Sequence, residues 1–392
     1  WVRLAGLGTA ELAVSDFRQA INAWMASTTD TEKAGIGARL EAASRNLNQL
    51  FFEPFVASGA LKSRAVLCPD GVLHFVPFAV LLDEAGNFPG ENLVLDYVVS
   101  ARDFCRDNED TVGRNLMASA VVIGGPDYRF QAAGAGAGGD APDTAGPLLV
   151  DQQGAQSSAK SGIARSGGVS LSPLPGAEKE AELIAGTLQT GGAAVTLLTA
   201  TAATEKALAG TSGPAILHVA THGVFFDLNF DSLVAGEFQA GVDPMLRGAL
   251  ALTGAQTAVS SWAHASFPDA DNDGWLFAAE AVQLDLQGTE LVTLSACETG
   301  IGSIASGEGV IGLRRAFLAA GAKHVLSTLW PIADEMTVQL MSDFYKRIGS
   351  GQKVSNAFAG AQGEALKSFR SKGAKAEAMT LFGAFVLNRS GN

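Results

Sequence analysis

Cysteine is scarce in this chain, with Cys68, Cys105 and Cys297 the only three among 392 residues. Secreted domains that depend on disulfides carry a dense and even set of cysteines, so this odd and sparse set does not indicate a disulfide framework. We therefore expect the protein in a reducing compartment, the cytoplasm.

Basic residues and long apolar runs are also in short supply. The 27 Lys and Arg are outnumbered by 40 Asp and Glu, giving a net charge of −13, and no basic cluster compensates. Binding to a phosphate backbone requires the opposite balance. No apolar run approaches the ~20 residues of a membrane-spanning helix, and no signal peptide is recognisable. We expect no direct nucleic-acid partner and no membrane association.

Strand and helix patterns alternate through most of the chain. Short apolar runs of strand character lie at 119–124, 193–198, 215–223, 291–297 and 325–329. Helical patterns lie between and after them, which predicts an α/β fold with a doubly wound, mostly parallel sheet flanked by helices. We expect an N-terminal helical and strand-containing subdomain at 1–115 and a larger domain at 116–392. The Gly-, Ala-, Ser- and Asp-rich stretch at 132–168 is predicted to be a flexible insertion in the larger domain.

Residues 64–75 carry two apolar runs around Pro69-Asp70-Gly71. Glycine tolerates the positive φ that a tight turn needs, so this pattern predicts a β-hairpin.

Two of the apolar runs carry reactive side chains at their ends. The run at 215–223 contains His222, and the run at 291–297 ends on Cys297. Parallel strands place their carboxyl ends at one edge of the sheet, where ligands bind. A catalytic thiol needs a nearby base, and His222 on a neighbouring strand fits that role. The backbone amides of Gly223 and Cys297 are candidates for stabilising an oxyanion.

Structural roles remain open for both side chains, because cysteines often pack as small apolar groups and a histidine can simply close a strand. We favour catalysis because both residues precede short Gly-containing loops in an α/β pattern. His218 shares a face of the extended strand with His222. We expect it to be a buried, hydrogen-bonded histidine that supports the catalytic pair.

The ordered motifs of this sequence resemble the CHAT domain, a group of caspase-like peptidases found beside TPR repeats. The motifs are Pro69-Asp-Gly-Val-Leu-His-Phe-Val-Pro77, Leu174-Pro-Gly-Ala-Glu-Lys-Glu180, His218-Val-Ala-Thr-His222-Gly223, Leu294-Ser-Ala-Cys297-Glu-Thr-Gly300, Ser327-Thr-Leu-Trp330-Pro331 and Phe382-Gly-Ala-Phe-Val-Leu387. The resemblance covers most of residues 38–389. It implies a caspase and separase type of fold and cleavage of protein or peptide substrates through an acyl-enzyme. By position, the dyad is Cys297 with His222. It also implies an upstream TPR region or a regulatory protein as a partner.

The stretch from Leu329 to Glu335 resembles the separase Leu-Trp-x-x-x-Asp element, whose carboxylate receives the arginine on the acyl side of the cleaved bond. Carried over by position, Asp334 binds a basic P1 residue and Trp330 forms a pocket wall. An equally weighted interpretation makes Asp334 the N-cap of the following helix.

Two other functions remain alternatives to a cysteine endopeptidase. One is a catalytically silent regulatory or scaffold CHAT module acting through protein–protein interaction, and the other is an acyltransferase that uses the same thiol. For the active enzyme, Lys160 and Arg165 in the 132–168 segment are candidate sites of self-cleavage.

No cofactor is required by this mechanism, but residues 269–280 match an EF-hand loop. Asp269, Asp271, Asp273 and Glu280 occupy ligand positions of that pattern. Pro268 stands where an entering helix should end, and CHAT domains commonly carry an Asp-Gly-x-Leu-x-x-x-Glu element without metal. In this alternative, Asp273-Gly274 forms a turn and Glu280 lies in the first turn of a helix. We keep calcium as the less favoured interpretation.

Overall fold

The computed structural model describes most of the chain, and the account below concerns that part. It comprises residues 6–59, 61–100, 102, 115–131, 170–225, 245, 248–262, 272–298, 307–330, 332 and 334–391. The predicted insertion at 132–168, with Lys160 and Arg165, lies outside the described residues, as do Cys105, Asp269 and Asp271.

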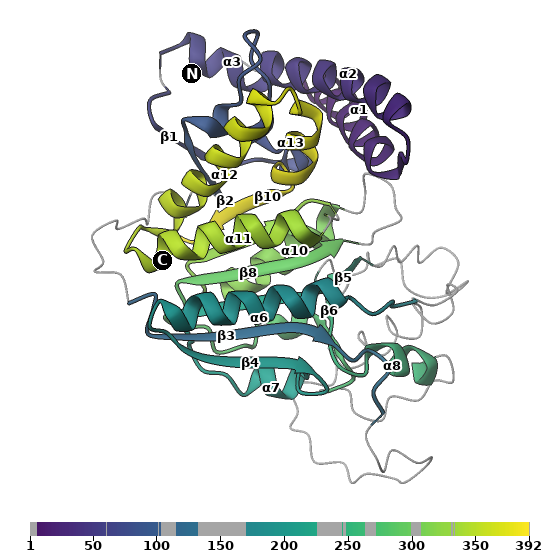
Figure 1. Cartoon of the computed structure of the whole chain (residues 1–392), viewed down its shortest axis with the longest axis vertical. Helices are drawn as coiled ribbons and strands as arrows, with labels where there is room; N and C mark the ends of the chain where they lie inside the picture. The colour runs from purple at the N-terminus through teal and green to yellow at the C-terminus, as the bar shows by residue number, and fades with distance from the viewer. Residues whose placement is uncertain are drawn as a thin grey trace.

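A ten-stranded sheet forms the centre of the molecule (Figure 1). Its strands are β1 (Arg64–Leu67), β2 (Val94–Val98), β3 (Ser119–Pro126), β4 (Ala194–Ala200), β5 (Ile216–Phe225), β6 (Gly248–Ala251), β7 (Trp275–Phe277), β8 (Leu291–Glu298), β9 (His324–Thr328) and β10 (Phe385–Arg389). Eight of them follow the order β1-β2-β10-β9-β8-β5-β3-β4, and β6 and β7 extend from β5. The pairs β1–β2, β2–β10, β3–β4, β3–β5, β5–β8 and β8–β9 are parallel. The predicted α/β class with a mostly parallel sheet is confirmed.

Helices cover both faces of this sheet. They are α1 (Leu7–Ala26), α2 (Asp30–Leu47), α3 (Glu53–Ala57), α6 (Pro175–Thr190), α7 (Glu205–Ala209), α8 (Ala255–Trp262), α9 (Ala278–Ala281), α10 (Gly307–Ala319), α11 (Asp334–Gly349), α12 (Val354–Ser371) and α13 (Lys375–Phe382). Figure 1 shows α6, α11 and α12 crossing in front of the sheet and α10 behind it. No helix in the described ranges is long and apolar enough to span a membrane.

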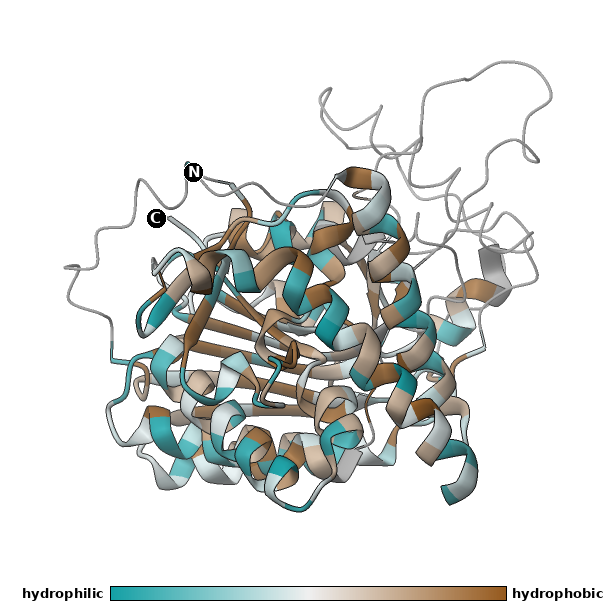
Figure 2. Ribbon diagram, turned by 90° about the horizontal axis from the view of Figure 1, so that it is seen from above, coloured by the Kyte–Doolittle hydropathy of each residue, from teal (hydrophilic) through white to brown (hydrophobic). Residues whose placement is uncertain are grey.

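The central strands are apolar on both sides because each side faces helices. Along β5, Ile216 belongs to the core that also contains side chains of α6 and α11. The next residue, Leu217, belongs to the opposite core, with side chains of α10. Figure 2 shows the same arrangement as apolar strands between amphipathic helices. A strand buried on both faces reads as a continuous apolar run, which is why the sequence identified these strands.

The predicted hairpin at 64–75 is wrong. β1 pairs in parallel with β2, and Gly71–Phe75 is a 3₁₀ helix. Gly71 does adopt a positive φ of 54°, and its amide donates to the Asp70 side chain. The turn was therefore placed correctly, but it leads into a helical turn that the two apolar runs do not reveal. β1 and β2 also join the same sheet as the later strands, so this part of the 1–115 segment continues the sheet.

Candidate active site

Strand register brings His222 and Cys297 together. β5 and β8 are parallel neighbours, and their Cα partners include Ala220 with Ser295 and His222 with Cys297. β9 lies on the other side of β8, with Leu294 partnering Ser327. The carboxyl-terminal halves of three adjacent strands therefore form one edge, which places the predicted nucleophile, the predicted base and the chain leading to Trp330 side by side.

The sheet continues beyond His222. The sequence predicted that the strand ends near this residue, but β5 extends to Phe225. Residues Gly223 to Phe225 pair with β6 in the antiparallel direction, and Gly223 is also the register partner of Glu298. Gly223, whose amide we predicted to bind an oxyanion, is buried inside this paired region.

The imidazole of His222 is held by two groups that the sequence did not identify. Its Nε2 lies 2.8 Å from the carbonyl oxygen of Ser172, and its ring centroid lies 5.1 Å from that of Tyr128. Since a carbonyl only accepts, Nε2 carries the proton and Nδ1 is left as the basic nitrogen. Burial lowers the pKa of His222, and the bond to Ser172 partly opposes that shift. The ring is therefore held in its neutral form at pH 7.

Tyr128 is itself fixed by the strand that carries His222. Its hydroxyl lies 3.0 Å from Oγ1 of Thr221, and the Thr221 hydroxyl donates to the carbonyl of Ala251 in β6. Burial raises the pKa of Tyr128, so its hydroxyl stays protonated at neutral pH. Only the fold brings β3 and β6 to this position, and no local sequence signal marks Tyr128 or Ser172.

His218 lies deeper on the same strand, in a buried polar network. Nδ1 of His218 is 3.0 Å from the hydroxyl of Tyr345 in α11, and that hydroxyl donates to Oγ1 of Thr293 in β8 at 2.8 Å. Because the tyrosine proton goes to Thr293, the Tyr345 oxygen accepts from Nδ1–H of His218. His218 is fully buried, as is Thr293. The role predicted for His218, support of the catalytic pair, stays a prediction.

Glu180 of α6 completes the network. Its Oε1 lies 3.3 Å from Nε2 of His218, and its Oε2 accepts from the hydroxyl of Ser295 at 3.0 Å. Both residues are buried, and a buried polar group is costly unless another polar group lies beside it. The network joins α6 and α11 to β5 and β8. Its strand residues His218 and Thr293 lie four positions before His222 and Cys297.

The predicted substrate residues follow β9. Trp330 is buried, and its indole N–H donates to the carbonyl of Thr380 in α13 at 2.8 Å. In the structure, this side chain therefore belongs to the core. Asp334 is the first residue of α11, and its alternative role as the N-cap of that helix stays a prediction. Substrate binding by Trp330 and Asp334 stays a prediction.

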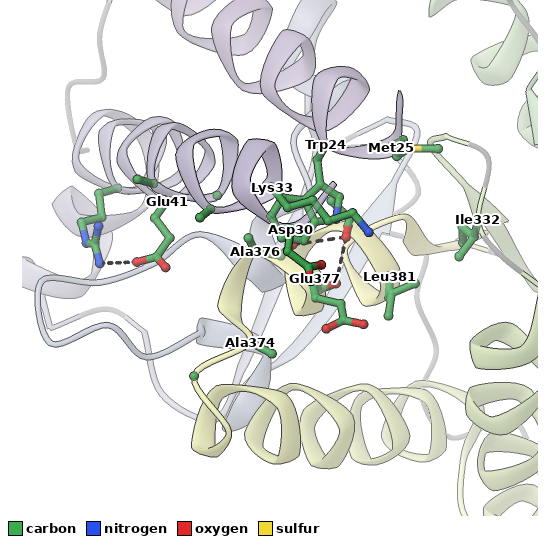
Figure 3. Close-up of a pocket in the computed structure, with 16 residues that line it drawn as sticks. Trp24, Met25, Asp30, Lys33, Glu41, Ile332, Ala374, Ala376, Glu377 and Leu381 are labelled. Atoms are coloured by element: carbon green, nitrogen blue, oxygen red, sulfur yellow. Dashed lines mark hydrogen bonds and ion pairs between the residues drawn. The ribbon is translucent and has the colours of Figure 1, made fainter. Parts of the chain in front are cut away.

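A hollow of about 970 Å³ opens beside this segment, between α1, α2 and α13. Figure 3 shows Ile332 at one side of it and Trp24, Lys33 and Glu377 around it. Both signs of charge line the hollow, and Glu41 and Arg45 within the lining form an ion pair at 3.0 Å. It is separate from the paired ends of β5 and β8.

The described part of the EF-hand-like loop, residues 272–280, has structural partners. The Asp273 carboxylate accepts from the amide of Trp275 at 3.0 Å, and the Glu280 carboxylate accepts from that of Phe277 at 2.7 Å. Gly274 has a φ of 89°, which only a glycine adopts without strain. This geometry is the turn and first helical turn of the alternative interpretation. Among the described residues, no group of His, Cys, Asp and Glu is arranged to hold a metal ion.

Comparisons with known proteins place these motifs in a wider context. A family model described as CHAT domain matches residues 41–384. A segment of 96 residues, 24% of this chain, is 38% identical to tetratricopeptide repeat protein 28 of Homo sapiens and 36% identical to that of Mus musculus. The matched segment is 4% of each relative's length.

Two solved structures align with most of the chain. One is the Arg specific cysteine proteinase gingipain R (RGPB), with 8% identity, a TM-score of 0.43 and coverage of 92% of this chain and 68% of the other. The second is a complex of Porphyromonas gingivalis RgpB pro- and mature domains, with 9% identity, a TM-score of 0.43 and coverage of 99% and 77%.

Proposed function

This chain belongs to the CHAT domain family, and on that premise we propose that it is a cysteine endopeptidase with Cys297 as nucleophile and His222 as base. The observation that supports this most is the strand register, which pairs the two residues directly across β5 and β8. Register partners on adjacent parallel strands lie close together at the end of the sheet where ligands bind, as a thiol and its base must.

The surroundings of His222 support its role in proton transfer. Nε2 is committed to the Ser172 carbonyl, so Nδ1 is the nitrogen that takes the proton of the Cys297 thiol. The thiolate attacks the peptide carbonyl, and the amides of Gly223 and Cys297 are the proposed donors to the oxyanion. The amine leaves with the proton from His222. Water then hydrolyses the thioester and restores the thiol.

A basic P1 residue is the proposed specificity. Asp334 is the first residue of α11, which follows β9, and β9 neighbours β8, so we propose that its carboxylate serves the substrate end of the same strands. A carboxylate pairs with an arginine guanidinium through charge-assisted hydrogen bonds. We further propose regulation by a TPR region or a partner protein, because the matched relatives are tetratricopeptide repeat proteins.

A regulatory or scaffold module without turnover is the second candidate, because CHAT domains need not be active. In that case, association with a TPR region or a partner protein would be the function of this domain. Both candidates share the fold and the family, and they differ in whether a substrate is cleaved.

Peptides with Arg, Leu or Asp at P1 separate these candidates. We expect the wild type to cleave the Arg peptide and Cys297→Ala to cleave none. Asp334→Asn is expected to raise KM for the Arg peptide and to leave the Leu peptide unaffected. Labelling of Cys297 by a thiol reagent without hydrolysis of any peptide would instead support the regulatory module.

A further inference from the structure

The hollow between α1, α2 and α13 adjoins the segment of chain that leads from β9 to Asp334. Its volume is about 970 Å³, and Ile332, two residues before Asp334, forms part of its wall (Figure 3). Binding sites for small ligands have volumes of about 300–1,000 Å³, so this hollow has room for several residues of a peptide.

The hollow lies at the same edge of the sheet as the proposed dyad. β10 runs antiparallel to β9, so its first residues lie beside the carboxyl end of β9. The amide of Leu329, just after β9, donates to the carbonyl of Ala384, just before β10, at 2.8 Å. The indole of Trp330 donates to the carbonyl of Thr380, a residue that lines the hollow. Outward from Cys297, this edge therefore runs from β8 to β9 and then to β10 with α13 and the hollow.

The proposed chemistry sets the direction in which a substrate crosses this edge. His222 on β5 gives its proton to the leaving amine, so the chain after the cleaved bond lies on the β5 side of Cys297. The P1 residue and those before it lie on the β9 side, which leads to Asp334. An extended peptide advances about 3.3 Å per residue, and neighbouring strands are about 4.8 Å apart. The third to fifth residues before the cleaved bond therefore reach past β9 to the hollow.

We propose that this hollow is a substrate subsite, which takes a large apolar side chain from the third to fifth residue before the cleaved bond. This subsite rests on the function proposed above, because the Cys297–His222 pair and Asp334 set the direction of the substrate. It adds a second determinant of specificity to the basic P1 residue.

The walls of the hollow suit an apolar side chain. Trp24, Met25, Ile332 and Leu381 line it, and each of them is at least partly exposed. Met25, at the end of α1, is 40% exposed. Apolar and aromatic walls with a few polar groups are typical of sites that bind small ligands and side chains. A leucine or phenylalanine of the substrate would cover these exposed apolar groups.

Small residues of α2 keep the hollow open. A Cβ atom at Gly37 would lie 3.1 Å from the Trp24 ring and 3.3 Å from Cβ of Ala376, so glycine allows α1 and α13 to approach α2 closely at the base. Ala34 and Ala38 also line the hollow, one helical turn apart, and both are exposed. A larger side chain at either position would occupy part of the hollow without replacing a core residue.

The charges around the hollow favour a basic peptide over a second copy of this chain. The lining contains three acidic residues and two basic ones, namely Asp30, Glu41, Glu377, Lys33 and Arg45. Glu41 and Arg45 form an ion pair, and the remaining balance is negative. A negative rim attracts a peptide with a basic P1 residue, and it repels a second chain of net charge −13.

Peptide binding to Cys297→Ala tests the subsite without turnover. The probes are fluorescent peptides with Arg at P1 and alanine at the other positions before the cleaved bond, or with one leucine at the third, fourth or fifth position. We expect the best leucine peptide to bind about tenfold more tightly than the all-alanine peptide, as burial of one leucine side chain predicts. Leucine peptides that bind no better than the all-alanine peptide overturn the proposal.

Filling the hollow is expected to remove that gain. Ala38→Trp, added to Cys297→Ala, should make the leucine and alanine peptides bind equally, and Ala34→Trp serves as a second variant should the first not fold. Ala42→Trp is the matched control, because Ala42 is exposed on the same helix but lies outside the lining. A gain that survives both filling variants, or that is lost equally in Ala42→Trp, overturns the subsite. The expected binding without hydrolysis by the wild type would contradict only the proposed peptidase activity.

Photo-crosslinking locates the bound side chain. The leucine of the best peptide is replaced by benzoylphenylalanine, and the crosslinked fragments are identified by mass spectrometry. We expect crosslinks to α2 and α13, the two helices that supply most of the lining. Crosslinks found only outside the lining would leave the hollow to another occupant and overturn the proposal.

Discussion

The hydroxyl of Tyr345 lies 3.0 Å from Nδ1 of His218 and donates to Oγ1 of Thr293 at 2.8 Å. The Tyr345 hydroxyl of α11 is thus hydrogen-bonded to His218 of β5 and to Thr293 of β8, the two strands that carry the proposed dyad. α11 begins at Asp334, the proposed P1-binding residue. The position of this helix is therefore linked to the spacing of β5 and β8 beneath the active site.

Removing that hydroxyl tests the link. Tyr345→Phe leaves the volume unchanged, but it deprives Nδ1–H of His218 of its acceptor, at a cost of about 1–3 kcal/mol. We expect a similar loss of stability for Tyr97→Phe, since the buried Tyr97 hydroxyl also has two partners, Phe78 and Val76. Only Tyr345→Phe is expected to lower kcat, by about tenfold, or ~1.4 kcal/mol of barrier. Equal kcat values in the two variants, measured with the best peptide, would argue against the link.

The buried Glu180–His218 pair predicts non-additive mutations. Glu180→Leu leaves Nε2 of His218 without its neighbour, and His218→Leu leaves the Glu180 carboxyl facing an apolar side chain, so each single change should be destabilising by about 3–5 kcal/mol. The double variant removes both groups and should cost less than the sum. Urea unfolding of the four proteins measures this coupling. Strict additivity would mean that the two groups, 3.3 Å apart, do not interact.

The pKa of His222 is predicted to lie below the ordinary value of 6.5, because the ring is partly buried against Tyr128. The unfolded histidine takes up a proton first as pH falls, so the folded state loses stability between pH 6.5 and the lower folded pKa. NMR titration of the five histidines, with His222→Asn for assignment, gives the value. Tyr128→Ala exposes the ring and should raise it. A wild-type value above 6.5 would contradict this account.

Calcium is expected to have no effect on the 269–280 loop. The carboxylates of Asp273 and Glu280 already accept backbone amides, and these bonds form the turn and the start of α9 without a metal. Differential scanning fluorimetry with added Ca²⁺ or EGTA should give the same melting temperature. Glu280→Ala should lower that temperature in both conditions, because it removes a helix-start bond, a change of about 1 kcal/mol. A shift on calcium addition that Glu280→Ala abolishes would restore the metal site.

The sequence predicted the parts of this fold that depend on local pattern. Strands such as 291–297 are apolar on both faces, and helices such as 335–348 show a regular apolar spacing. Both kinds of element could therefore be recognised from the sequence. The hairpin at 64–75 was wrong because β1 finds its partner in β2, about thirty residues later, and local pattern does not encode that pairing.

The candidate site likewise contains residues that local motifs predict and residues that only the fold brings together. His222 and Cys297 could be predicted because each lies in a recognisable motif at a strand's carboxyl-terminal part. Ser172, Tyr128 and Glu180 could not, since each reaches its histidine only through the fold. A carbonyl oxygen such as that of Ser172 leaves no trace in the sequence at all, because every residue has one.

Cleavage of a complex peptide mixture tests the central claim most directly. The wild type, Cys297→Ala and His222→Ala are each incubated with the same mixture, and new N-termini are identified by mass spectrometry. The account predicts new termini with the wild type alone, formed after basic residues. Identical termini in all three samples would contradict it, because hydrolysis would then require neither Cys297 nor His222.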